Sequence, residues 1–298
     1  MHKLDTIKNI YFIGIGGIGM SALARYFVAK GCVVNGYDKT KTILTEALSE
    51  LGIDIHYEDN IDLIDKNASV VVYTPAIPAS HTELTYFNIC VAGTHGKTTV
   101  STMIAHLLRD SGYGCTAFLG GIAANYNTNF WSSDNNVVVV EADEYDRSFL
   151  KLHPSVAVIT SMDADHLDIY KTPEAFEDAF VSFSEKVKAG GLLLAKKGLA
   201  REASFDTSKL VTYSLNGTGA SIYAKDITVV NGAYCFTAVG PDWQIEELVL
   251  NMGGLHNIEN ALVAIAVAVH LGIDPEKIKI ALANFAGVKR RFEYLVKT

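Results

Sequence analysis

Two segments of the chain each combine an apolar strand, a glycine-rich turn and a helix, and this combination strongly limits the available folds. In the first, the run 9–13 leads into a glycine-rich turn and a helical stretch at 20–30. In the second, the run 88–92 leads into Gly-Thr-His-Gly-Lys-Thr-Thr and a helix expected over 98–111. Continuous β-branched runs separated by helical periods are typical of parallel sheets covered on both faces. The sequence therefore predicts two α/β units.

The 298 residues are long enough for two domains, since a single domain typically has about 100–150 residues. We expect residues 1–88 to form a Rossmann-like parallel-sheet domain and residues 89–298 to form an α/β domain of the P-loop ATPase type. From about residue 220 the pattern changes to short alternating strands with a hairpin signal at Asn231-Gly232. This change predicts a small antiparallel β section in the second domain.

Composition excludes several classes of protein. The formal charge of −8 argues against nucleic acid or an anionic membrane surface as the main partner. The four cysteines are scattered without a C-x-x-C pair, which is typical of unpaired thiols in a reducing compartment. No run approaches the ~18 apolar residues of a membrane span, and no signal-peptide core is apparent at the N-terminus. We expect a cytoplasmic protein.

The first glycine-rich turn has the G-x-G-x-x-G pattern at Gly14, Gly16 and Gly19. Glycines at these positions let the backbone approach a pyrophosphate, whose charge is favoured at a helix N-terminus. Asp38 follows at the end of the next strand, where a ribose hydroxyl would bind. The pattern predicts a nucleotide-diphosphate site, with glycines that serve only packing as the alternative. It does not distinguish NAD from other nucleotides.

The second turn is a shortened phosphate loop, in which Gly93 stands three residues before Gly96. Its glycines expose backbone N–H groups to an anion, Lys97 reaches β- and γ-phosphates, and the Thr98 hydroxyl can bind Mg²⁺. A chance strand–glycine–helix corner would not need the sequence Gly-Lys-Thr-Thr. We therefore predict a nucleoside-triphosphate site.

An acidic segment follows the apolar run 136–141. Glu141 stands at the carboxyl end of this expected strand, where ligands bind in open α/β sheets, and a carboxylate beside a phosphate loop suits Mg²⁺. The other acids of the segment, Asp143, Glu144 and Asp146, fit a solvated loop. We expect Glu141 to be the metal ligand.

A histidine follows the next expected strand, 155–160. His166 lies between Asp165 and Asp168 and could complete the metal site, provided that the two strands are neighbours and end at the same edge. A solvated loop histidine is the alternative. Further along, Asn257 at a helix start suits an N-cap, and the cations Lys289-Arg290-Arg291 suit either solvent or a nucleotide phosphate.

Seven motifs stand in order along the chain: GIGGIGMSALA (14–24), YTPAIP (73–78), AGTHGKTT (92–99), EADEYD (141–146), DADHLD (163–168), LHNIENA (255–261) and KRRFE (289–293). In type and order they resemble the motifs of the Mur ligases over essentially the whole chain. The first motif resembles that of the alanine-adding type more than that of the murein tripeptide-recycling type.

The resemblance implies that the first nucleotide is a UDP-sugar and the second is ATP. The implied ligands are UDP-N-acetylmuramate, ATP, L-alanine and Mg²⁺ at two sites, in a monomer or homodimer. The implied reaction joins L-alanine to the lactyl carboxylate of UDP-N-acetylmuramate through an acyl phosphate. Residues 1–88 would then bind the UDP-sugar, and residues 89–298 would form the central ATP-binding domain.

The resemblance also implies roles for individual residues. Lys97 would stabilise the transferring γ-phosphoryl group, Thr98 would bind one Mg²⁺, and Glu141 with His166 would bind a second. The expected UDP-sugar contacts are Gly14, Gly16, Gly17, Ile18, Gly19, Met20, Ser21, Asp38, Thr74, Pro75 and Ala76. The expected ATP contacts are Gly93, Thr94, His95, Gly96, Lys97, Thr98, Thr99, Asn257, Asn260, Arg290 and Arg291. His95 is additionally expected to act in catalysis by touching the sugar substrate.

Three departures from the family pattern carry expectations of their own. No C-terminal amino-acid-binding domain follows KRRFE, so we expect the chain to bind nucleotides as an inactive fragment. The stretch before AGTHGKTT is shorter than in the family. Val181-Ser182 occupies the region where some relatives have a carbamylated lysine, so no such ligand is expected.

Three other functions remain as alternatives at this point. One is a nucleotide-binding regulatory module without chemistry, which would not need a metal position beside the phosphate loop. Another is the tripeptide-recycling ligase, and the third is an NAD-linked oxidoreductase based on the first glycine turn alone.

Overall fold

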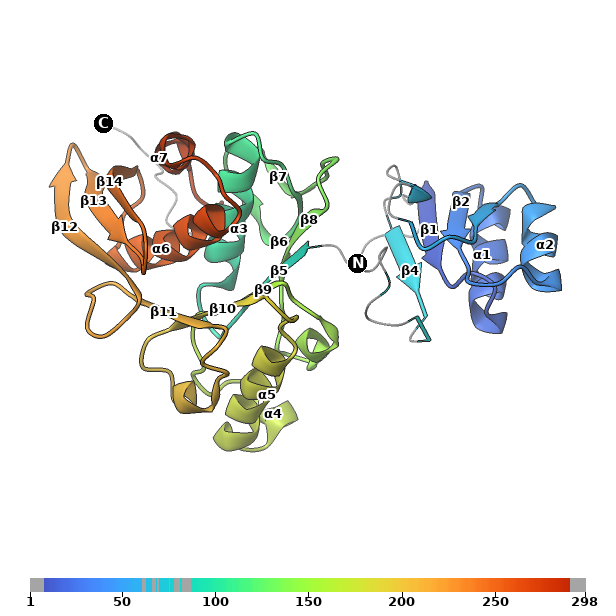
Figure 1. Cartoon of the computed structure of the whole chain (residues 1–298), viewed down its shortest axis with the longest axis horizontal. Helices are drawn as coiled ribbons and strands as arrows, with labels where there is room; N and C mark the ends of the chain where they lie inside the picture. The colour runs from blue at the N-terminus through green and yellow to red at the C-terminus, as the bar shows by residue number, and fades with distance from the viewer. Residues whose placement is uncertain are drawn as a thin grey trace. The chain divides into compact units, whose positions relative to one another are not determined.

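The structure is a computed structural model of the whole chain. It describes residues 8–60, 63–65, 68, 70–74, 76–77, 81 and 87–289. The contacts divide the chain into two compact units, Met1–Tyr86 and Phe87–Thr298, and each is described by itself (Figure 1). The first unit contains a parallel sheet and the second a larger mixed sheet, which confirms the predicted α/β fold class.

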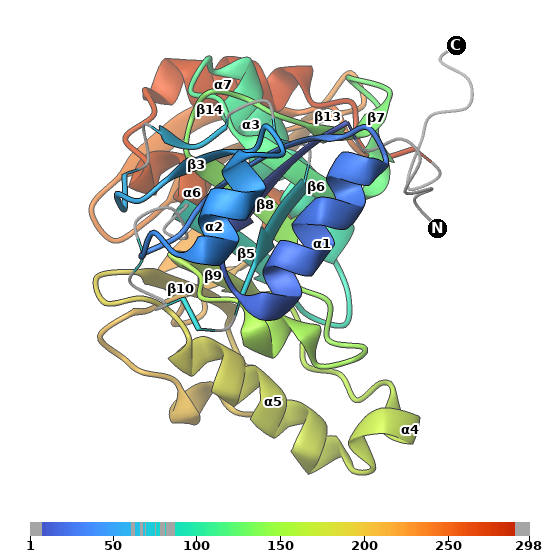
Figure 2. The ribbon, with the colours of Figure 1, turned by 90° about the vertical axis from the view of Figure 1, so that its right-hand side faces the viewer.

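The first unit is a four-stranded parallel sheet in the order β3-β2-β1-β4. Its elements are β1 (Asn9–Ile13), α1 (Ile18–Ala29), β2 (Val33–Tyr37), α2 (Ile43–Ser49), β3 (Asp54–His56) and β4 (Val70–Tyr73). Ile10 and Phe12 of β1 pack with Ala24 and Phe27 of α1 and with Leu48 of α2, so both helices cover the same face of the sheet (Figure 2). The glycine-rich turn joins β1 to α1 at the carboxyl edge.

The second unit contains a ten-stranded sheet in the order β14-β13-β12-β11-β10-β9-β5-β8-β6-β7. The strands are β5 (Phe87–Ala92), β6 (Thr116–Ala123), β7 (Thr128–Trp131), β8 (Val137–Glu141), β9 (Val156–Ile159), β10 (Leu192–Lys196), β11 (Leu210–Ser214), β12 (Ile222–Val230), β13 (Ala233–Val239) and β14 (Gln244–Leu250). The helices are α3 (Lys97–Asp110), α4 (Leu167–Tyr170), α5 (Pro173–Glu185), α6 (Leu255–His270) and α7 (Pro275–Asn284), with short 3₁₀ turns η4 (Ser148–Lys151) and η5 (Glu202–Ser204).

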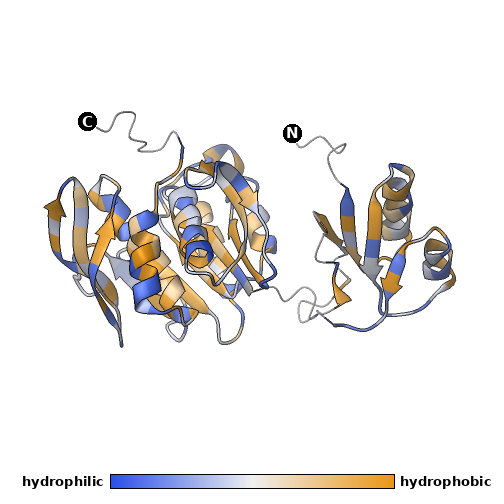
Figure 3. Cartoon of the chain, turned by 90° about the horizontal axis from the view of Figure 1, so that it is seen from above, coloured by the Kyte–Doolittle hydropathy of each residue, from blue (hydrophilic) through white to orange (hydrophobic). Residues whose placement is uncertain are grey.

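Two hydrophobic cores lie on opposite faces of this sheet. Ile89 and Val91 of β5 pack in the core that contains α3, α6 and α7, whereas Cys90 and Ala92 pack in the core that contains α5. The central strands are therefore buried on both faces, as their continuous apolar runs predict. The helices carry both hydrophobic and hydrophilic residues, as the colouring of Figure 3 shows.

The predicted hairpin is present between β12 and β13. Asn231 and Gly232 have φ angles of 51° and 81°, and Val230 pairs with Ala233 across the turn. Positive φ at both central residues is what a two-residue hairpin turn of this hand requires. The antiparallel strands β12, β13 and β14 extend the main sheet through the parallel pair of β11 and β12.

Two of the cysteines lie in the hydrophobic cores of the second unit. Cys90 and Cys115 are fully buried, and burial raises the pKa of each thiol to about 12, so both stay protonated. Within the described residues, no helix combines the length and hydrophobicity that crossing a bilayer requires.

A buried histidine makes the stability of the second unit pH-dependent. His106 Nε2 lies 2.7 Å from the Ala281 carbonyl, which can only accept, so Nε2 carries the proton and Nδ1 accepts from the Tyr126 hydroxyl at 2.9 Å. Burial lowers the pKa of His106, although its hydrogen bond to Ala281 raises it. Below about pH 6.5 the unfolded chain therefore binds a proton at His106 that the folded chain does not bind.

We expect the free energy of unfolding to fall by up to about 1.4 kcal/mol from pH 7.5 to pH 5.5 through His106 alone. Urea unfolding of the wild type and of His106→Gln at both pH values measures this contribution. The variant should be less stable overall but should lose less stability on acidification. Equal losses in the two proteins would contradict the assignment.

Candidate functional site

The glycine-rich turn of the first unit is fixed at the carboxyl edge of the sheet. The N–H groups of Gly14 and Ile15 donate to the Tyr37 carbonyl at 2.8 and 3.0 Å, which ties the turn to the end of β2. Gly14 has φ +85°, and a Cβ there would lie 2.5 Å from Thr74 Cγ2. The structure thus brings together Gly14 and Thr74, two of the residues predicted to contact the UDP-sugar.

Asp38 organises this turn. Its Oδ2 accepts from the Gly16 N–H at 2.7 Å, and its Oδ1 accepts from the Thr40 N–H at 3.1 Å. A Cβ on Gly16 would lie 2.8 Å from the same Oδ2 and 2.7 Å from Thr45 Cγ2, so only glycine fits without displacement. Each carboxylate oxygen can accept a second hydrogen bond, so the predicted ribose contact of Asp38 stays a prediction.

The remaining predicted residues of this site differ in their surroundings. The Ile18 side chain is 85% exposed at the first position of α1, whereas Ser21 is buried and its hydroxyl donates to the Ile18 carbonyl. The Ala76 N–H donates to Thr74 Oγ1 at 3.4 Å. Gly17 precedes α1, Gly19 has open space beside it, and Met20 packs against the core. Pro75 lies outside the described residues.

The phosphate loop of the second unit, residues 93–96, joins β5 to α3 and packs against the end of β9. The His95 N–H donates to Ser161 Oγ at 2.8 Å, and the Thr94 hydroxyl donates to the Asp163 carbonyl at 2.7 Å. Gly96 has φ +88° and immediately precedes α3. The loop therefore stands at the amino end of a buried 14-residue helix, the position that a phosphate-binding site requires.

Lys97 is held at this loop by two acceptors. Its Nζ donates to the Gly93 carbonyl at 2.9 Å and to Glu144 Oε1 at 2.7 Å. Glu144 is only 1% exposed, so the expectation that it belongs to a solvated loop is wrong. Asp143 and Asp146 are exposed, as expected for that loop.

Glu141 ends β8 with three donors around its carboxylate. Oε2 accepts from Thr98 Oγ1 at 3.1 Å, and Oε1 accepts from Ser101 Oγ at 3.1 Å and from the Gly120 N–H at 2.6 Å. Ser101 and Gly120 were not among the predicted site residues. Ser101 lies one helical turn after Thr98, so the i, i+3 spacing on α3 was a usable signal.

The oxygens of Thr98 and Glu141 fit a Mg²⁺ site in part. Mg²⁺ prefers octahedral oxygen ligands at about 2.0–2.1 Å, which places adjacent ligand atoms about 2.9 Å apart. Thr98 Oγ1 and Glu141 Oε2 are 3.1 Å apart, close to that separation. Within the described residues, however, no group of three or more His, Cys, Asp or Glu side chains is arranged to hold a metal.

His166 contacts other neighbours than Glu141. Its Nε2 lies 3.8 Å from Asp165 Oδ2, and its ring stands edge-on to Tyr145 with centroids 5.0 Å apart. The expectation that the two strands are neighbours is wrong, because β8 and β9 pair with opposite sides of β5. Glu141 and the segment that carries His166 therefore flank the phosphate loop from its two sides. His166 has φ 53°, a conformation that is uncommon outside glycine.

Helix α6 also contributes to the loop's surroundings. Asn260 Oδ1 lies 3.5 Å from the position of a Cβ on Gly96, and Asn260 Nδ2 donates to Asn257 Oδ1 at 3.1 Å. Asn257 does not cap the helix as expected, because α6 already begins at Leu255. Its buried amide donates instead to the Gly253 carbonyl at 2.6 Å.

The other predicted ATP contacts vary in exposure. The His95 side chain is 76% exposed, with Nε2 3.9 Å from Asp163 Oδ2, so its ring can reach a ligand outside the loop. Thr99 is buried in the first turn of α3. Arg290 and Arg291 lie outside the described residues.

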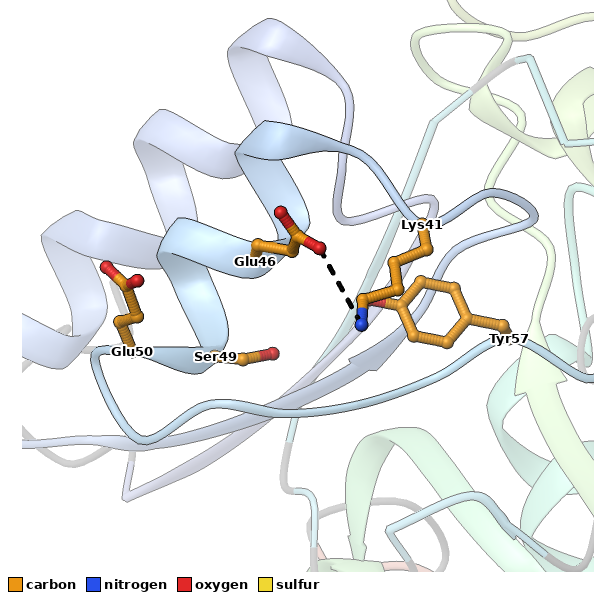
Figure 4. Close-up of a pocket in the computed structure, with 5 residues that line it drawn as sticks. All are labelled: Lys41, Glu46, Ser49, Glu50 and Tyr57. Carbon is orange, nitrogen blue, oxygen red and sulfur yellow. Dashed lines mark ion pairs between the residues drawn. The ribbon is translucent and has the colours of Figure 1, made fainter.

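A surface pocket on the first unit contains none of the predicted site residues. It is lined by Lys41, Glu46, Ser49, Glu50 and Tyr57 (Figure 4). Lys41 Nζ and Glu46 Oε1 are 3.6 Å apart, and both side chains are more than half exposed. An exposed ion pair of this kind contributes little to the free energy of unfolding. We place no candidate site at this pocket.

A glycine turn, a lysine and a threonine at the start of α3 and a carboxylate at the end of β8 are an arrangement typical of α/β proteins that bind nucleoside phosphates. Residues 91–268 match the family model described as Mur ligase middle domain, and residues 9–91 match the model described as Mur ligase family, catalytic domain. The chain belongs to the Mur ligase family.

Several relatives align with nearly the whole chain. The chain is 46% identical to a UDP-N-acetylmuramate–L-alanine ligase of Parabacteroides distasonis, over 99% of the chain and 70% of the relative. It is 45% identical to the ligase of the same name from Flavobacterium johnsoniae, with the same coverage. Among solved structures it resembles the UDP-N-acetylmuramate-alanine ligase of Thermotoga maritima, with a TM-score of 0.64 and 28% identity over 98% of this chain and 71% of that one.

One of these alignments is longer than the chain itself. The alignment with the Parabacteroides distasonis ligase spans 324 positions, although the chain has 298 residues. The relative therefore has positions within the aligned region that this chain lacks. The expected shortening of the stretch before the second glycine turn stays a prediction.

Proposed function

We propose that the chain provides the UDP-N-acetylmuramate-binding and ATP-binding parts of a UDP-N-acetylmuramate–L-alanine ligase, an enzyme of peptidoglycan precursor synthesis. The 46% identity over 99% of the chain to a ligase of that name is the observation that carries this proposal. The reaction joins L-alanine to the lactyl carboxylate of UDP-N-acetylmuramate through an acyl phosphate, and ATP supplies the phosphoryl group.

The geometry of the second unit supports this chemistry. Phosphoryl transfer depends mainly on positioning and on neutralising charge. Lys97 places an ammonium group at the phosphate loop, where it would bind the β- and γ-phosphates. Thr98 would hold one Mg²⁺ and Glu141 with His166 a second, and Mg²⁺ neutralises phosphate charge when bound.

The proposed division of labour follows the two units. Residues 1–88 would bind the UDP-sugar at the turn organised by Asp38, and residues 89–298 would bind ATP. His95 would touch the sugar substrate, and Asn257 and Asn260 would contact ATP. The chain aligns with 70% of the length of these relatives.

Further parts of the proposal rest on composition and family. A net charge of −8 supports small-molecule substrates over nucleic acid or a membrane surface as partners. From the family we propose a cytoplasmic protein that is a monomer or a homodimer. Two Mg²⁺ ions would serve the reaction. The tripeptide-recycling ligase is less favoured, because relatives that are 41–46% identical to this chain bear the name of the alanine ligase. Family membership also disfavours an NAD-linked oxidoreductase.

Ligand-induced stabilisation tests the two sites separately. UDP-N-acetylmuramate at 100 times its Kd should add about 2.7 kcal/mol to the free energy of unfolding of its unit. Gly16→Val should abolish this effect and leave the ATP effect intact, because its side chain would collide with Asp38 and Thr45. Gly52→Ala, in the same unit but outside the predicted site and with open space around its Cβ, is the matched control; its φ of +84° costs some stability, but both ligand effects should remain.

Thermal-shift titrations with UDP-N-acetylmuramate, with ATP and Mg²⁺, and with NAD measure these outcomes. Stabilisation by NAD in place of the UDP-sugar would contradict the proposed substrate. Loss of both effects in Gly16→Val would show that the substitution unfolds more than the first turn.

A further inference from the structure

A buried carboxylate holds the lysine of the phosphate loop. Glu144 Oε1 accepts from Lys97 Nζ at 2.7 Å, and the Gly93 carbonyl accepts from the same ammonium at 2.9 Å. The Lys97 side chain is 18% exposed and that of Glu144 is 1% exposed. Any phosphate that binds Lys97 must therefore compete with a carboxylate that is almost fully removed from water.

A buried tyrosine holds the backbone of Glu144. The Tyr170 hydroxyl donates to the Glu144 carbonyl, and Tyr170 is 1% exposed. Burial raises the pKa of Tyr170 to about 12, so the hydroxyl stays protonated and remains a donor. This hydrogen bond ties the Glu144 backbone, in the segment after β8, to the end of α4.

The second carboxylate oxygen of Glu144, Oε2, is not neutralised by a hydrogen bond from any residue that the structure describes. Oε2 is buried and has no hydrogen-bond partner among the described residues. A buried carboxylate with one oxygen unpartnered relies on its cation for neutralisation, since burial of an unpaired charge is costly. Lys97 is the cation that contacts this buried carboxylate.

We propose that Glu144 is a positioning residue that restrains Lys97 and thereby weakens binding of the β- and γ-phosphates. The inference rests on the proposed ATP site and assigns a regulating partner to its lysine. The physical effect is competition: the phosphates must displace a charge-assisted hydrogen bond from Lys97 before they can bind its ammonium group. Nucleotides without a β-phosphate do not reach Lys97 and escape this competition.

Glu144→Gln tests the proposal, because glutamine keeps the shape and removes the charge. Calorimetric titration of the full chain should show ADP and ATP binding about tenfold tighter than in the wild type, with AMP unchanged, because the phosphates no longer displace a charged carboxylate from Lys97. The increase should appear with EDTA as well as with Mg²⁺. Asp143→Asn, an exposed charge change in the same loop, should alter each affinity less than about twofold.

A double-mutant cycle identifies the partner through which Glu144 acts. In a Lys97→Met background, Glu144→Gln should leave ADP affinity unchanged. Tyr170→Phe, which frees the Glu144 backbone, should tighten ADP binding in the same direction by a smaller factor. This milder variant decides the question if Glu144→Gln does not fold.

Several outcomes would overturn the proposal. They are unchanged or weaker ADP binding in Glu144→Gln, tighter binding that persists without Lys97, or an effect that requires Mg²⁺. Absence of ADP binding to the wild type would overturn both this inference and the proposed function, whereas normal wild-type binding with a silent Glu144→Gln would overturn the inference alone.

Discussion

Replacing Lys97 with methionine is expected to destabilise the second unit and to abolish most of its affinity for ATP. The buried Glu144 would lose the cation 2.7 Å from its Oε1. Removing one partner of a buried ion pair typically costs about 3–5 kcal/mol, because the remaining charge is left uncompensated. We expect the free energy of unfolding to fall by about that amount at neutral pH. ATP affinity should fall about 10- to 100-fold with the loss of the charge-assisted hydrogen bonds.

The double variant Lys97→Met/Glu144→Gln separates these two effects. It should recover most of the lost stability, because no uncompensated charge remains, but it should bind ATP as weakly as Lys97→Met. Urea unfolding and calorimetric titration measure the two quantities independently. If the double variant were as unstable as the single one, the destabilisation would come from lost packing of the lysine stem.

Lys196→Met is the matched control for an ion-paired lysine. Lys196 Nζ lies 2.8 Å from Glu259 Oε2, but this lysine is 43% exposed and its partner 15%. Water can solvate the carboxylate after the substitution, so we expect a loss of about 1 kcal/mol or less. A loss as large as that of Lys97→Met would remove burial as the explanation.

Local sequence was sufficient to predict the strands and turns that build the sites. The turns at Gly14 and Gly93 could be predicted because apolar runs, glycines with positive φ and helix starts are encoded within a few residues. The carboxyl-edge location of Glu141 followed from the same local pattern. The lysine and threonine of the phosphate loop are also fixed by their place at the start of α3.

Strand order could not be read from local patterns. β5 precedes β8 and β9 in the sequence, yet β5 lies between these two strands in the sheet. Sequence order favoured β8 and β9 as neighbours, which would have placed Glu141 beside His166. Strand insertion is decided by packing of helices on both faces, and that information is spread over the whole unit.

The burial of Glu144 was equally inaccessible. Its segment contains four acids in six residues, which is typical of a solvated loop. The contacts that bury it come from Lys97 and Tyr170, which are 47 and 26 residues away. Gly120 was overlooked for a related reason, although a glycine within a strand often marks a close approach by another group. Its N–H donates to Glu141.

Gly93→Ala is expected to disrupt the phosphate loop more than any other single methyl addition at a glycine of this loop. A Cβ at Gly93 would lie 2.2 Å from Thr160 Oγ1 and 2.8 Å from the Ser161 backbone nitrogen, and Gly93 has φ +131°. The strained backbone and the forced displacement of β9 should together cost about 3–5 kcal/mol. Because the Gly93 carbonyl accepts from Lys97, ATP affinity should fall as well.

A glycine with positive φ but open surroundings separates strain from collision. Gly198 has φ +86° and no atom near the position of its Cβ, so Gly198→Ala should cost about 1 kcal/mol and leave ATP affinity unchanged. In Gly93→Ala/Thr160→Ala the contact with Oγ1 is relieved while that with the Ser161 backbone remains, so only part of the stability should return. Urea unfolding measures the loss in the free energy of unfolding for Gly93→Ala and for Gly198→Ala. Equal losses would show that the phosphate loop does not press against the end of β9. The close approach of these two segments would then not explain how Lys97 is held at the phosphate site.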